Sequence, residues 1–368
     1  MGDLIQRYMV CGIQYSPVEL HVGPEATKRN LKRMKDYFEY TYEQYSYTAD
    51  AGCTDYPKQI KVIAYPEYAA NGYPAGSMEE ALKASEEVPG SITDEIGSWC
   101  KEYDTFVMYG MGSTVPEFPK TSFDTAIIQD DTGEVVLRYH KCNPWIPDEY
   151  WPSPYDLIDI GWDLEKYPYY PVAKTKIGNW GAMICNDGMT PEGGRQLAFN
   201  GAECIYHPEL LMDPWVIEPL EYYELQNRWC SVTNMCYTVA PHSGWSPIEM
   251  PPYGMQGGSL ICDFEGRLLC ACAKAAVEGT MQTTIDIGAV RHYRQSMPTH
   301  NGLNSFKGGL FDYFKRDITY PRHPQIAEDP SWDMYKSRAT MREAMDRFWG
   351  DYYRSEERRV GKECRSRW

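Results

Sequence analysis

Two hydrophobic patterns alternate along most of this chain. Amphipathic periodicity predicts a helix over residues 24–45, where Leu31, Met34, Phe38 and Tyr42 fall roughly on one face. Further helices are predicted at residues 78–84, 91–103, 191–201 and 220–235. Short apolar runs typical of buried strands lie at residues 9–15, 61–65, 105–110, 124–129, 135–139, 171–176, 180–185, 203–207, 237–240, 259–262, 268–271 and 280–287. Strands that alternate with helices in this way predict an α/β fold.

Two hairpins interrupt the alternation. Residues 130–133 read Asp-Asp-Thr-Gly between two predicted strands, and residues 263–267 form a second turn of this kind. A purely parallel, doubly wound sheet does not contain hairpins. We therefore predict two mixed sheets with helices on their outer faces.

The chain divides into three parts. We predict one domain over residues 1–290, because no internal repeat or low-complexity linker interrupts it. Residues 291–353 are rich in tyrosine and proline and predict a C-terminal arm that packs on the same domain or on a neighbouring subunit. Residues 354–368 carry six basic and three acidic side chains without apolar periodicity. We interpret them as a non-native tail, and the alternative is a disordered basic tail that binds a partner.

Composition argues against several kinds of partner. The net charge of −16 disfavours nucleic acid and anionic membrane surfaces, which both select basic proteins. No apolar run approaches the roughly 18 residues of a membrane span, and the start of the chain is too polar for a signal peptide. The twelve cysteines include no Cys-x-x-Cys, and the seven histidines show no ligand spacing. We therefore expect free thiols in a reducing cytoplasm and no metal site.

Three polar residues stand where predicted strands end. Glu67 follows the strand at residues 61–65, Lys141 follows the strand at 135–139, and Cys185 ends the strand at 180–185. Strand ends are where layered α/β enzymes place their sites. A carboxylate, an ammonium and a thiol can together carry out covalent catalysis, since the thiol needs a base and the reaction needs an oxyanion donor.

The surroundings of Cys185 are typical of a nucleophile turn. An apolar strand breaks at Cys185, and a helix is predicted to start at Pro191. Such a turn predicts an exposed sulfur, nearby backbone N–H donors and a helix N-terminus that favours negative charge. Taken alone, Cys185 is more simply a buried thiol, and the interpretation depends on Glu67 and Lys141.

Three segments resemble the signature of a known superfamily. Residues 65–68 read Tyr-Pro-Glu-Tyr, residues 139–141 read Tyr-His-Lys, and residues 184–187 read Ile-Cys-Asn-Asp. In order and spacing they are similar to the Glu–Lys–Cys motifs of the nitrilase (carbon–nitrogen hydrolase) superfamily. The resemblance covers roughly residues 8–290.

Within that superfamily the chain most resembles the aliphatic amidase and formamidase branch. This branch has Pro-Trp and a glutamate eight residues after the lysine, which matches Glu149 here, and residues 185–192 look formamidase-like. Two features depart from the branch. Residues 207–212 lack the tyrosine that contacts substrate in the amidases, and Asn186 is also found in N-carbamoyl amino-acid hydrolases.

The resemblance implies a fold and a reaction. The fold is a four-layer αββα sandwich with a C-terminal arm, which in this superfamily pairs through its helices into dimers or larger assemblies. The reaction is hydrolysis of a small aliphatic amide to a carboxylic acid and ammonia through a thioester at Cys185, without a cofactor. Glu67 is the implied base and acid, Lys141 supports the oxyanion with the Asn186 N–H, and Glu149 orients the amide nitrogen or the water. The implied substrate-binding residues are Tyr68, Trp145, Asn186 and Asp187.

Several alternatives stay open at this point. The substrate could be an N-carbamoyl amino acid or a nitrile, and the chain could be an inactive scaffold on the same fold. A papain-like pair of Cys185 and His242 is possible but leaves Glu67 and Lys141 without a role. Tyr68 and Trp145 could be core aromatics, and Asp187 could cap the following helix or hold the turn.

Overall fold

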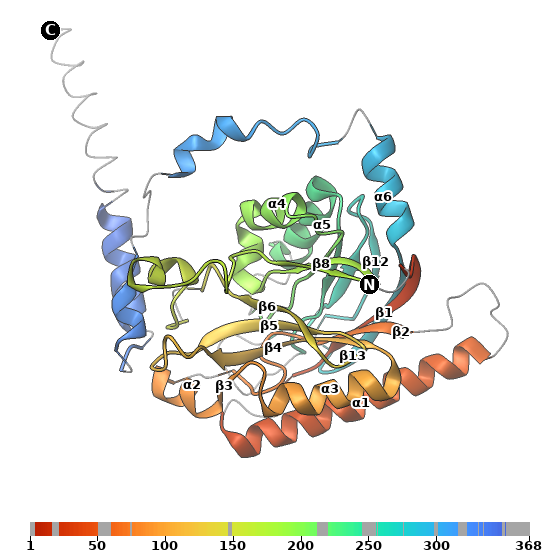
Figure 1. The fold of residues 1–368 in the computed structure, drawn as a ribbon, viewed down its shortest axis with the longest axis horizontal. Coiled ribbons are helices and arrows are strands. Elements are labelled where there is room, and N and C mark those ends of the chain that lie inside the picture. Colours follow the sequence, from red (N-terminus) through yellow and green to blue (C-terminus); the bar gives the residue numbers. More distant parts are fainter. Residues whose placement is uncertain are drawn as a thin grey trace, which may run out of the picture.

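The computed structural model of the chain describes residues 4–16, 22–50, 60–73, 76–145, 149–211, 220–244, 255, 257–274, 276–297, 301–315, 322–329, 331–333, 335–347 and 350. Figure 1 shows two twisted sheets stacked face to face, with helices on the outside of each. This arrangement is the αββα sandwich that the sequence predicts.

The first sheet has seven strands in the order β13-β1-β2-β4-β5-β6, with β3 paired to β4. Its central strands β1, β2 and β4 run parallel, and the hairpin β4-β5-β6 and the edge strand β13 are antiparallel. The bounds are β1 Arg7–Gln14, β2 Ile60–Ala64, β3 Glu86–Glu87, β4 Phe106–Thr114, β5 Phe123–Gln129, β6 Val135–His140 and β13 Gly279–Asp286.

The second sheet has six strands in the order β12-β11-β10-β9-β8-β7. Strands β8, β9 and β10 are parallel, and an antiparallel hairpin lies at each side of them. The bounds are β7 Val172–Thr175, β8 Gly178–Ala182, β9 Cys204–Tyr206, β10 Tyr237–Ala240, β11 Leu260–Cys262 and β12 Leu268–Ala271. Both sheets are mixed, as the two hairpin turns predict.

The helices form the two outer layers (Figure 1). Helices α1 and α3 lie against the first sheet, and α4 and α5 lie against the second. The bounds are α1 Pro24–Asp50, α2 Met78–Ala84, α3 Ser91–Tyr103, α4 Pro191–Phe199, α5 Tyr222–Asn234 and α6 Ile287–Ser296. The 3-10 turns are η1 Pro154–Ile160, η2 Cys185–Met189, η3 Gly308–Lys315 and η4 Pro324–Ala327.

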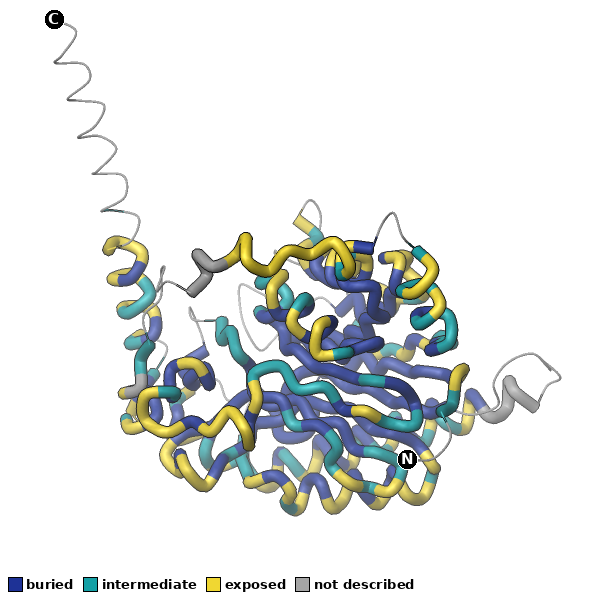
Figure 2. The backbone as a smooth tube through the Cα atoms, turned by 45° about the horizontal axis from the view of Figure 1, so that its top comes forward, coloured by how far each residue is buried: buried dark blue, intermediate teal, exposed yellow. Residues whose placement is uncertain are grey.

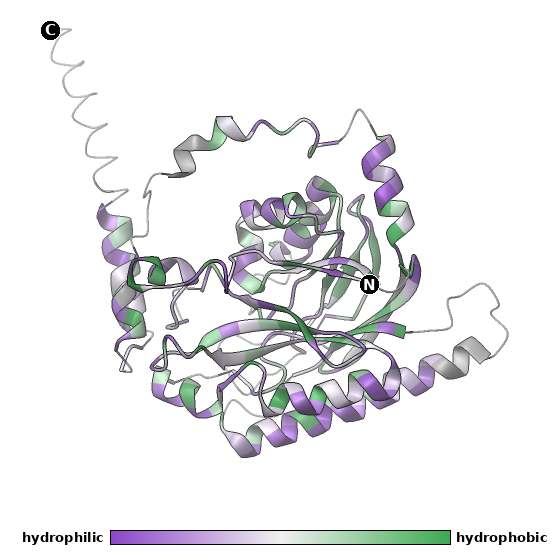
Figure 3. Cartoon of the chain, viewed as in Figure 1, coloured by the Kyte–Doolittle hydropathy of each residue, from purple (hydrophilic) through white to green (hydrophobic). Residues whose placement is uncertain are grey.

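Apolar side chains fill the spaces between all four layers. Leu31, Met34 and Phe38 of α1 are buried against the first sheet, on the face that the periodicity predicts. Between the sheets, the Tyr8 hydroxyl donates to the Ile177 carbonyl oxygen at 2.7 Å. Figure 2 shows the strands buried and the exposed residues gathered on the outside of the helices. Figure 3 shows hydrophilic residues along the helices and hydrophobic residues concentrated in the strands between them.

The structure differs from the sequence-based expectation in several places. Strand β8 ends at Ala182 rather than at Cys185, because Cys185 has a φ of +46° and starts a 3-10 turn. Helix α6 follows β13 directly and spans the predicted domain boundary at residue 290. Ile287 and Val290 of this helix are fully buried in the core, so the packed domain continues into α6.

Part of the C-terminal arm lies against the domain of its own chain. Ile326 and Trp332 are buried in a cluster with Tyr68, Tyr150 and Trp151. The suspected tail at residues 354–368 lies outside the described residues. The predicted boundaries of the arm and the tail stay predictions.

The described part of the chain has neither a membrane-spanning helix nor paired cysteines. None of its helices combines the length and the apolar composition that crossing a bilayer requires. Its ten described cysteines are free thiols, seven of them buried, as the Cys spacing predicts.

Candidate active site

Glu67 lies in the loop after β2 and is buried. The loop rests on β4, since the Gly110 N–H donates to the Pro66 carbonyl oxygen at 3.2 Å and the Gly110 carbonyl oxygen accepts from Ala70 at 3.2 Å. A Cβ on Gly110 would lie 2.7 Å from the Cα of Glu67. Only glycine permits so close an approach of two backbones, so Gly110 helps to fix the position of Glu67.

Lys141 follows β6 and is equally buried. Its Nζ lies 2.8 Å from Glu67 Oε1 and 2.6 Å from Glu149 Oε1. Asp124 Oδ2 of β5 is 3.4 Å from the same nitrogen. The structure thus brings together the predicted residues Glu67, Lys141 and Glu149, and it adds Asp124, which the sequence reasoning missed.

Burial and mutual repulsion act on the acids of this cluster. Burial, followed by the charge of Glu67, raises the pKa of Asp124 well above its ordinary value. Burial raises the pKa of Glu149 to about 7, although the Lys141 ammonium opposes the shift. Burial disfavours the charged form of Lys141, but the acidic groups around it hold its pKa well above the ordinary value. These shifts favour the charged form of Lys141 and the protonated form of Asp124.

The same carboxylates form a set of oxygen donors that could hold a cation. One oxygen from each of Glu67, Asp124 and Glu149 lies within 4.8 Å of the others, and hard divalent cations prefer such ligands. The ammonium of Lys141 contacts all three. Lys141 therefore supplies the positive charge that this group of acids needs.

Cys185 lies at the start of η2 and reaches the cluster from the second sheet. The residue is 4% exposed and packs among side chains of both sheets, so the expectation of an exposed sulfur was wrong. The strand end faces the other sheet rather than solvent. Burial, and then the charge of Glu67, raises the pKa of the Cys185 thiol well above its ordinary value, while Lys141 lowers it. The resting thiol is therefore neutral and needs a base before it can react.

The Asn186 N–H is the backbone donor next to the thiol. Among the backbone hydrogen bonds of the described residues that lie outside helices and strands, none is donated by this N–H. The N–H of Cys185 itself is bonded to the Pro208 carbonyl oxygen at 3.0 Å, so it is occupied. The side chain of Asn186 donates to the Asn143 carbonyl oxygen at 3.1 Å. The backbone N–H of Asn186 is therefore placed to donate to an oxyanion. Its side-chain amide meanwhile bonds to the loop that contains Asn143.

Asp187 holds the turn that carries the nucleophile. It is fully buried, and its Oδ2 accepts from the Ile184 N–H at 2.9 Å and from the Tyr139 hydroxyl at 2.7 Å. Its Oδ1 accepts from the Asn143 N–H at 2.8 Å. These contacts support the alternative in which Asp187 positions the turn, and its assignment to substrate binding stays a prediction.

Two tyrosine hydroxyls tie the sheets together at the site. Tyr139, at the end of β6, bonds to Asp187 after β8. Tyr206, on β9, donates to the Tyr65 carbonyl oxygen at 2.5 Å, next to the loop that carries Glu67. These bonds join the segment that carries Cys185 on one sheet to the segments that carry Glu67 and Lys141 on the other.

The two predicted aromatic residues have different surroundings. Tyr68 has a φ of +54° and is buried edge-on against Tyr73 and Trp151. Burial, together with the nearby Asp124 and Glu149, raises its pKa well above the ordinary value, so it lies beside the carboxylates. Trp145 is half-buried, and its backbone N–H donates to Glu149 Oε2 at 2.5 Å. Contact of either ring with substrate stays a prediction.

A second polar group that the sequence reasoning missed lies behind Cys185. His207 Nε2 is 3.1 Å from the Cys185 carbonyl oxygen, and its Nδ1 is 3.0 Å from Glu209 Oε1. The signal in the sequence was a histidine and a glutamate two residues apart directly after a buried strand. His242 is not placed as a base for Cys185, because its Nδ1 faces the Ser243 carbonyl oxygen and burial lowers its pKa to about 4.

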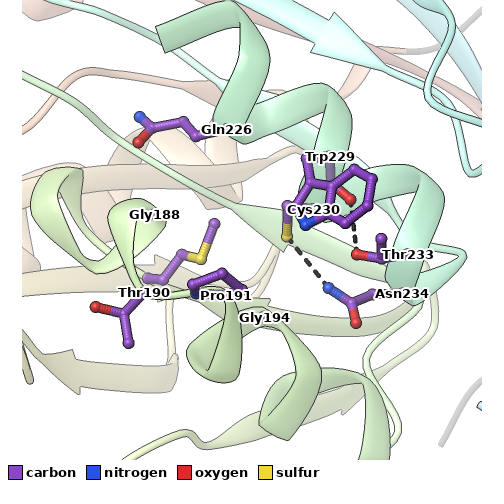
Figure 4. A pocket seen from close by; sticks show the side chains of 10 residues that line it. Gly188, Thr190, Pro191, Gly194, Gln226, Trp229, Cys230, Thr233 and Asn234 are labelled. Carbon is purple, nitrogen blue, oxygen red and sulfur yellow. Dashed lines mark hydrogen bonds between the residues drawn. The ribbon is translucent and has the colours of Figure 1, made fainter. Parts of the chain in front are cut away.

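A separate cleft lies on the outer side of the second sheet. Figure 4 shows Trp229, Thr233 and Asn234 of α5 on one side of it, with Thr190 and Pro191 at the start of α4 on the other. Its lining residues are Met183, Gly188, Thr190, Pro191, Gly194, Gln226, Trp229, Cys230, Thr233 and Asn234. None of them is a predicted catalytic residue, so this cleft is distinct from the buried cluster.

The buried cluster lies in a part of the chain that is similar to a known protein family. The model of the carbon-nitrogen hydrolase family matches residues 13–295. The chain belongs to this family. The three motifs that resembled the superfamily lie within the matched range.

Among curated proteins, the chain is similar to a formamidase from Bacillus cereus (strain Q1), at 29% identity over 214 residues. The match covers 57% of this chain and 57% of the formamidase, so the chain spans little more than half the length of that relative.

Two solved structures show the same fold. One is a branch 10 member of the nitrilase superfamily from Saccharomyces cerevisiae, with a TM-score of 0.61 and 18% identity over 81% of this chain and 97% of that one. The other is a mutant amidase from Nesterenkonia sp. AN1 with the acetamide moiety of fluoroacetamide added covalently at its active site cysteine. It has a TM-score of 0.58 and 16% identity over 83% of this chain and 96% of that one.

Proposed function

We propose that this carbon-nitrogen hydrolase cleaves small aliphatic amides through a thioester on Cys185. The observation that carries the proposal is the buried ammonium of Lys141 held between Glu67 and Glu149, at 2.8 and 2.6 Å, with a neutral thiol close enough for Glu67 to shift its pKa. A dry site with a base, a cation and a thiol suits acyl transfer.

In the first half of the reaction the enzyme is acylated. Glu67 takes the proton from the Cys185 thiol, and the sulfur attacks the amide carbon. The Lys141 ammonium and the Asn186 N–H stabilise the resulting oxyanion. Glu67 then returns the proton to the nitrogen as the C–N bond breaks, so that ammonia leaves and a thioester remains.

In the second half water releases the acid. Glu67 removes a proton from water, whose oxygen attacks the thioester carbon. The same two donors stabilise the second oxyanion, and the C–S bond breaks as Glu67 gives the proton back to the sulfur. Glu149 accepts a hydrogen bond from the Lys141 ammonium. From this position its carboxylate orients the amide nitrogen or the water.

The similarity to formamidases supports a short acyl group. A covalent acetamide group on the cysteine of the Nesterenkonia amidase is consistent with acylation at sulfur. Hydrolysis of an N-carbamoyl amino acid is the second candidate, because Asn186 follows the cysteine as it does in those hydrolases. The dense burial around the cluster favours the smaller substrate.

A panel of substrates tests the proposal. Ammonia release is measured with formamide, acetamide and propionamide, beside an N-carbamoyl amino acid and a nitrile, each at the same enzyme concentration. We expect turnover of the short amides, with kcat/KM highest for one of them. Activity confined to nitriles or to the carbamoyl compound would reject the amidase assignment, and no activity on any compound would favour an inactive scaffold.

The ionisation of Glu149 should make kcat/KM depend on pH. Both its oxygens accept hydrogen bonds, from Lys141 and from the Trp145 N–H, so the arrangement needs the ionised form. Because its pKa lies at about 7, kcat/KM should fall as the pH drops below 7, and Glu149→Gln should remove this limb along with most activity.

The contribution of Glu149 to the free energy of unfolding should change with pH in the opposite direction to kcat/KM. The pKa of Glu149 is raised in the folded state, so the folded chain binds this proton more tightly than the unfolded chain does. The contribution of Glu149 to stability is therefore largest below pH 4.5 and is lost as the pH rises to 7. Thermal unfolding recorded over the same pH range separates the two effects, because an acid limb caused by unfolding would come with a lower melting temperature.

We also propose that the protein forms homo-oligomers through the outer face of α4 and α5. Phe199, Leu225, Trp229 and Val232 are between 43% and 60% exposed there, and exposed apolar groups on neighbouring helices mark contact surfaces. The molar mass in solution is the measurement that checks this.

A further inference from the structure

A buried histidine holds the peptide group that joins Cys185 to Asn186. His207 Nε2 lies 3.1 Å from the carbonyl oxygen of this peptide, and the N–H of Cys185 donates to the carbonyl oxygen of the next residue, Pro208. His207 is fully buried and directly follows β9, the neighbour of β8. Cys185 has a strained φ of +46°. Hydrogen bonds at both its N–H and its carbonyl oxygen therefore hold the backbone in this conformation.

Both ring nitrogens of His207 face hydrogen-bond acceptors. Its Nδ1 lies 3.0 Å from Glu209 Oε1 and 2.7 Å from Asn227 Oδ1. The orientation of the Asn227 amide is fixed, because its nitrogen donates to Glu209 at 2.7 Å and to the Tyr223 carbonyl oxygen at 2.9 Å. A ring with an acceptor at each nitrogen needs a proton on each, which makes His207 an imidazolium.

Glu209 is the counter-ion of this imidazolium: burial raises the pKa of its carboxyl, and the charge of His207 and the hydrogen bonds from His207 and Asn227 oppose that rise. It is fully buried, and besides His207 and Asn227 it accepts from Gln226 at 2.5 Å. The other titratable groups that face His207 from the packed elements are neutral: burial raises the pKa of the Cys185 thiol and lowers that of His242. Burial disfavours a charge on His207, but Glu209 outweighs it, and the pKa of His207 is raised.

Little space is left for this ring to move. A Cβ on Gly188, in the turn η2, would lie 2.5 Å from Cε1 of His207 and 2.9 Å from Oε1 of Gln226. The turn that carries the nucleophile thus packs directly on the imidazolium. The glycine at position 188 permits this contact.

We propose that the His207–Glu209 pair polarises the Cys185–Asn186 peptide and so strengthens the Asn186 N–H as a donor to the oxyanion. A cation bonded to a carbonyl oxygen draws electron density from the whole peptide group, and the N–H on the other side becomes the better donor. His207 acts through the Cys185 carbonyl oxygen, so it is a positioning residue. The proposal rests on the proposed amidase reaction, in which this N–H binds the oxyanion.

Two conservative variants test the role of the charge. His207→Gln keeps a donor for the Cys185 carbonyl oxygen but is neutral. Removal of a whole oxyanion donor typically lowers kcat by about 10²–10³-fold, so weakening this one should lower kcat by about 10-fold with KM unchanged. Glu209→Gln keeps the shape but removes the counter-ion, and because burial disfavours the charged ring, the pKa of His207 should fall below its ordinary value of about 6.5. At pH 7.5 the ring of this variant should therefore be neutral, and its kcat should lie about 10-fold below that of the wild type.

A purely structural role gives a different result. If His207 only holds the turn, His207→Gln keeps the wild-type kcat, and Glu209→Gln also keeps the wild-type kcat at pH 7.5 after correction for the folded fraction. Either result overturns the proposal.

A measurement on the wild-type protein covers the case in which the variants do not fold. Nitrogen-15 NMR of the histidine rings at pH 8.5 should show a doubly protonated ring, since an ordinary histidine with a pKa of about 6.5 is neutral there. Absence of any doubly protonated ring in a spectrum that resolves all seven histidines overturns the proposal. This reading does not depend on turnover, so a wild-type enzyme without amidase activity would reject the proposed function separately.

Discussion

Replacing Cys185 by alanine is expected to abolish ammonia release from short amides, lowering kcat by at least about 10⁴-fold. The thiol is the group that forms the bond to the acyl carbon, and the buried acids and lysine around it cannot replace it as a nucleophile. Wild-type enzyme quenched during turnover should carry the mass of the acyl group on Cys185, and the alanine variant should carry none. Intact-protein mass spectrometry with peptide mapping checks both statements.

A second cysteine serves as the matched control. Cys270 lies on β12, is half-buried and has no part in the cluster, so Cys270→Ala should retain both turnover and the adduct. An adduct found on Cys270 or on another thiol would contradict the assignment of the nucleophile. Turnover that survives in the Cys185 variant would contradict the thioester route altogether.

Lys141→Met should remove both activity and a large part of the stability. The loss of one oxyanion donor typically lowers kcat by about 10²–10³-fold. In addition, the variant leaves Glu67, Asp124 and Glu149 within 4.8 Å of one another with no cation between them. Removing one partner from a buried ionic group destabilises a protein by about 3–5 kcal/mol. The remaining acids should bind protons in the folded state, so the loss of unfolding free energy should be larger at pH 7.5 than at pH 5.5.

Lys61 provides the comparison. It is the buried lysine of β2, and its Nζ is 2.5 Å from Asp104 Oδ2, away from the cluster. Lys61→Met should cost stability while the folded enzyme keeps its kcat. Urea unfolding at the two pH values, together with ammonia release, measures both variants. A Lys141 variant as stable as the wild type at pH 7.5 would show that the acids do not depend on its charge.

The layers of the fold could be predicted from the sequence because they depend on short-range patterns. The apolar periodicity of α1, the buried runs of the parallel strands and the Asp130–Gly133 turn all act within a few residues. What lies between the two sheets depends on contacts across the chain. The prediction of an exposed Cys185 sulfur was wrong for this reason. The local sequence predicts a solvent-exposed strand end, but the opposite sheet covers it.

The candidate residues Glu67, Lys141 and Cys185 could be chosen from their position at strand ends and from the resemblance of three motifs, and their catalytic roles stay predictions. Asp124 could not be chosen in this way, because the register between β5 and β6 decides that it lies opposite Lys141. An irregularity between Ile128 and Gln129 shifts this pairing, so that Thr125 faces His140 and the Asp124 carbonyl oxygen accepts from the Lys141 N–H. A regular hairpin counted outward from the turn would misplace Asp124 by one residue.

The way in which the site is shared between the sheets has a consequence for the newly made chain. The base, the lysine and Glu149 come from residues 67–149, whereas Cys185 and the His207 pair are made later and belong to the other sheet. Until the sheets dock and the Tyr139 and Tyr206 hydroxyls join them, the cysteine has no base beside it and behaves as an ordinary thiol. The proposed active site therefore forms only when the two sheets have docked.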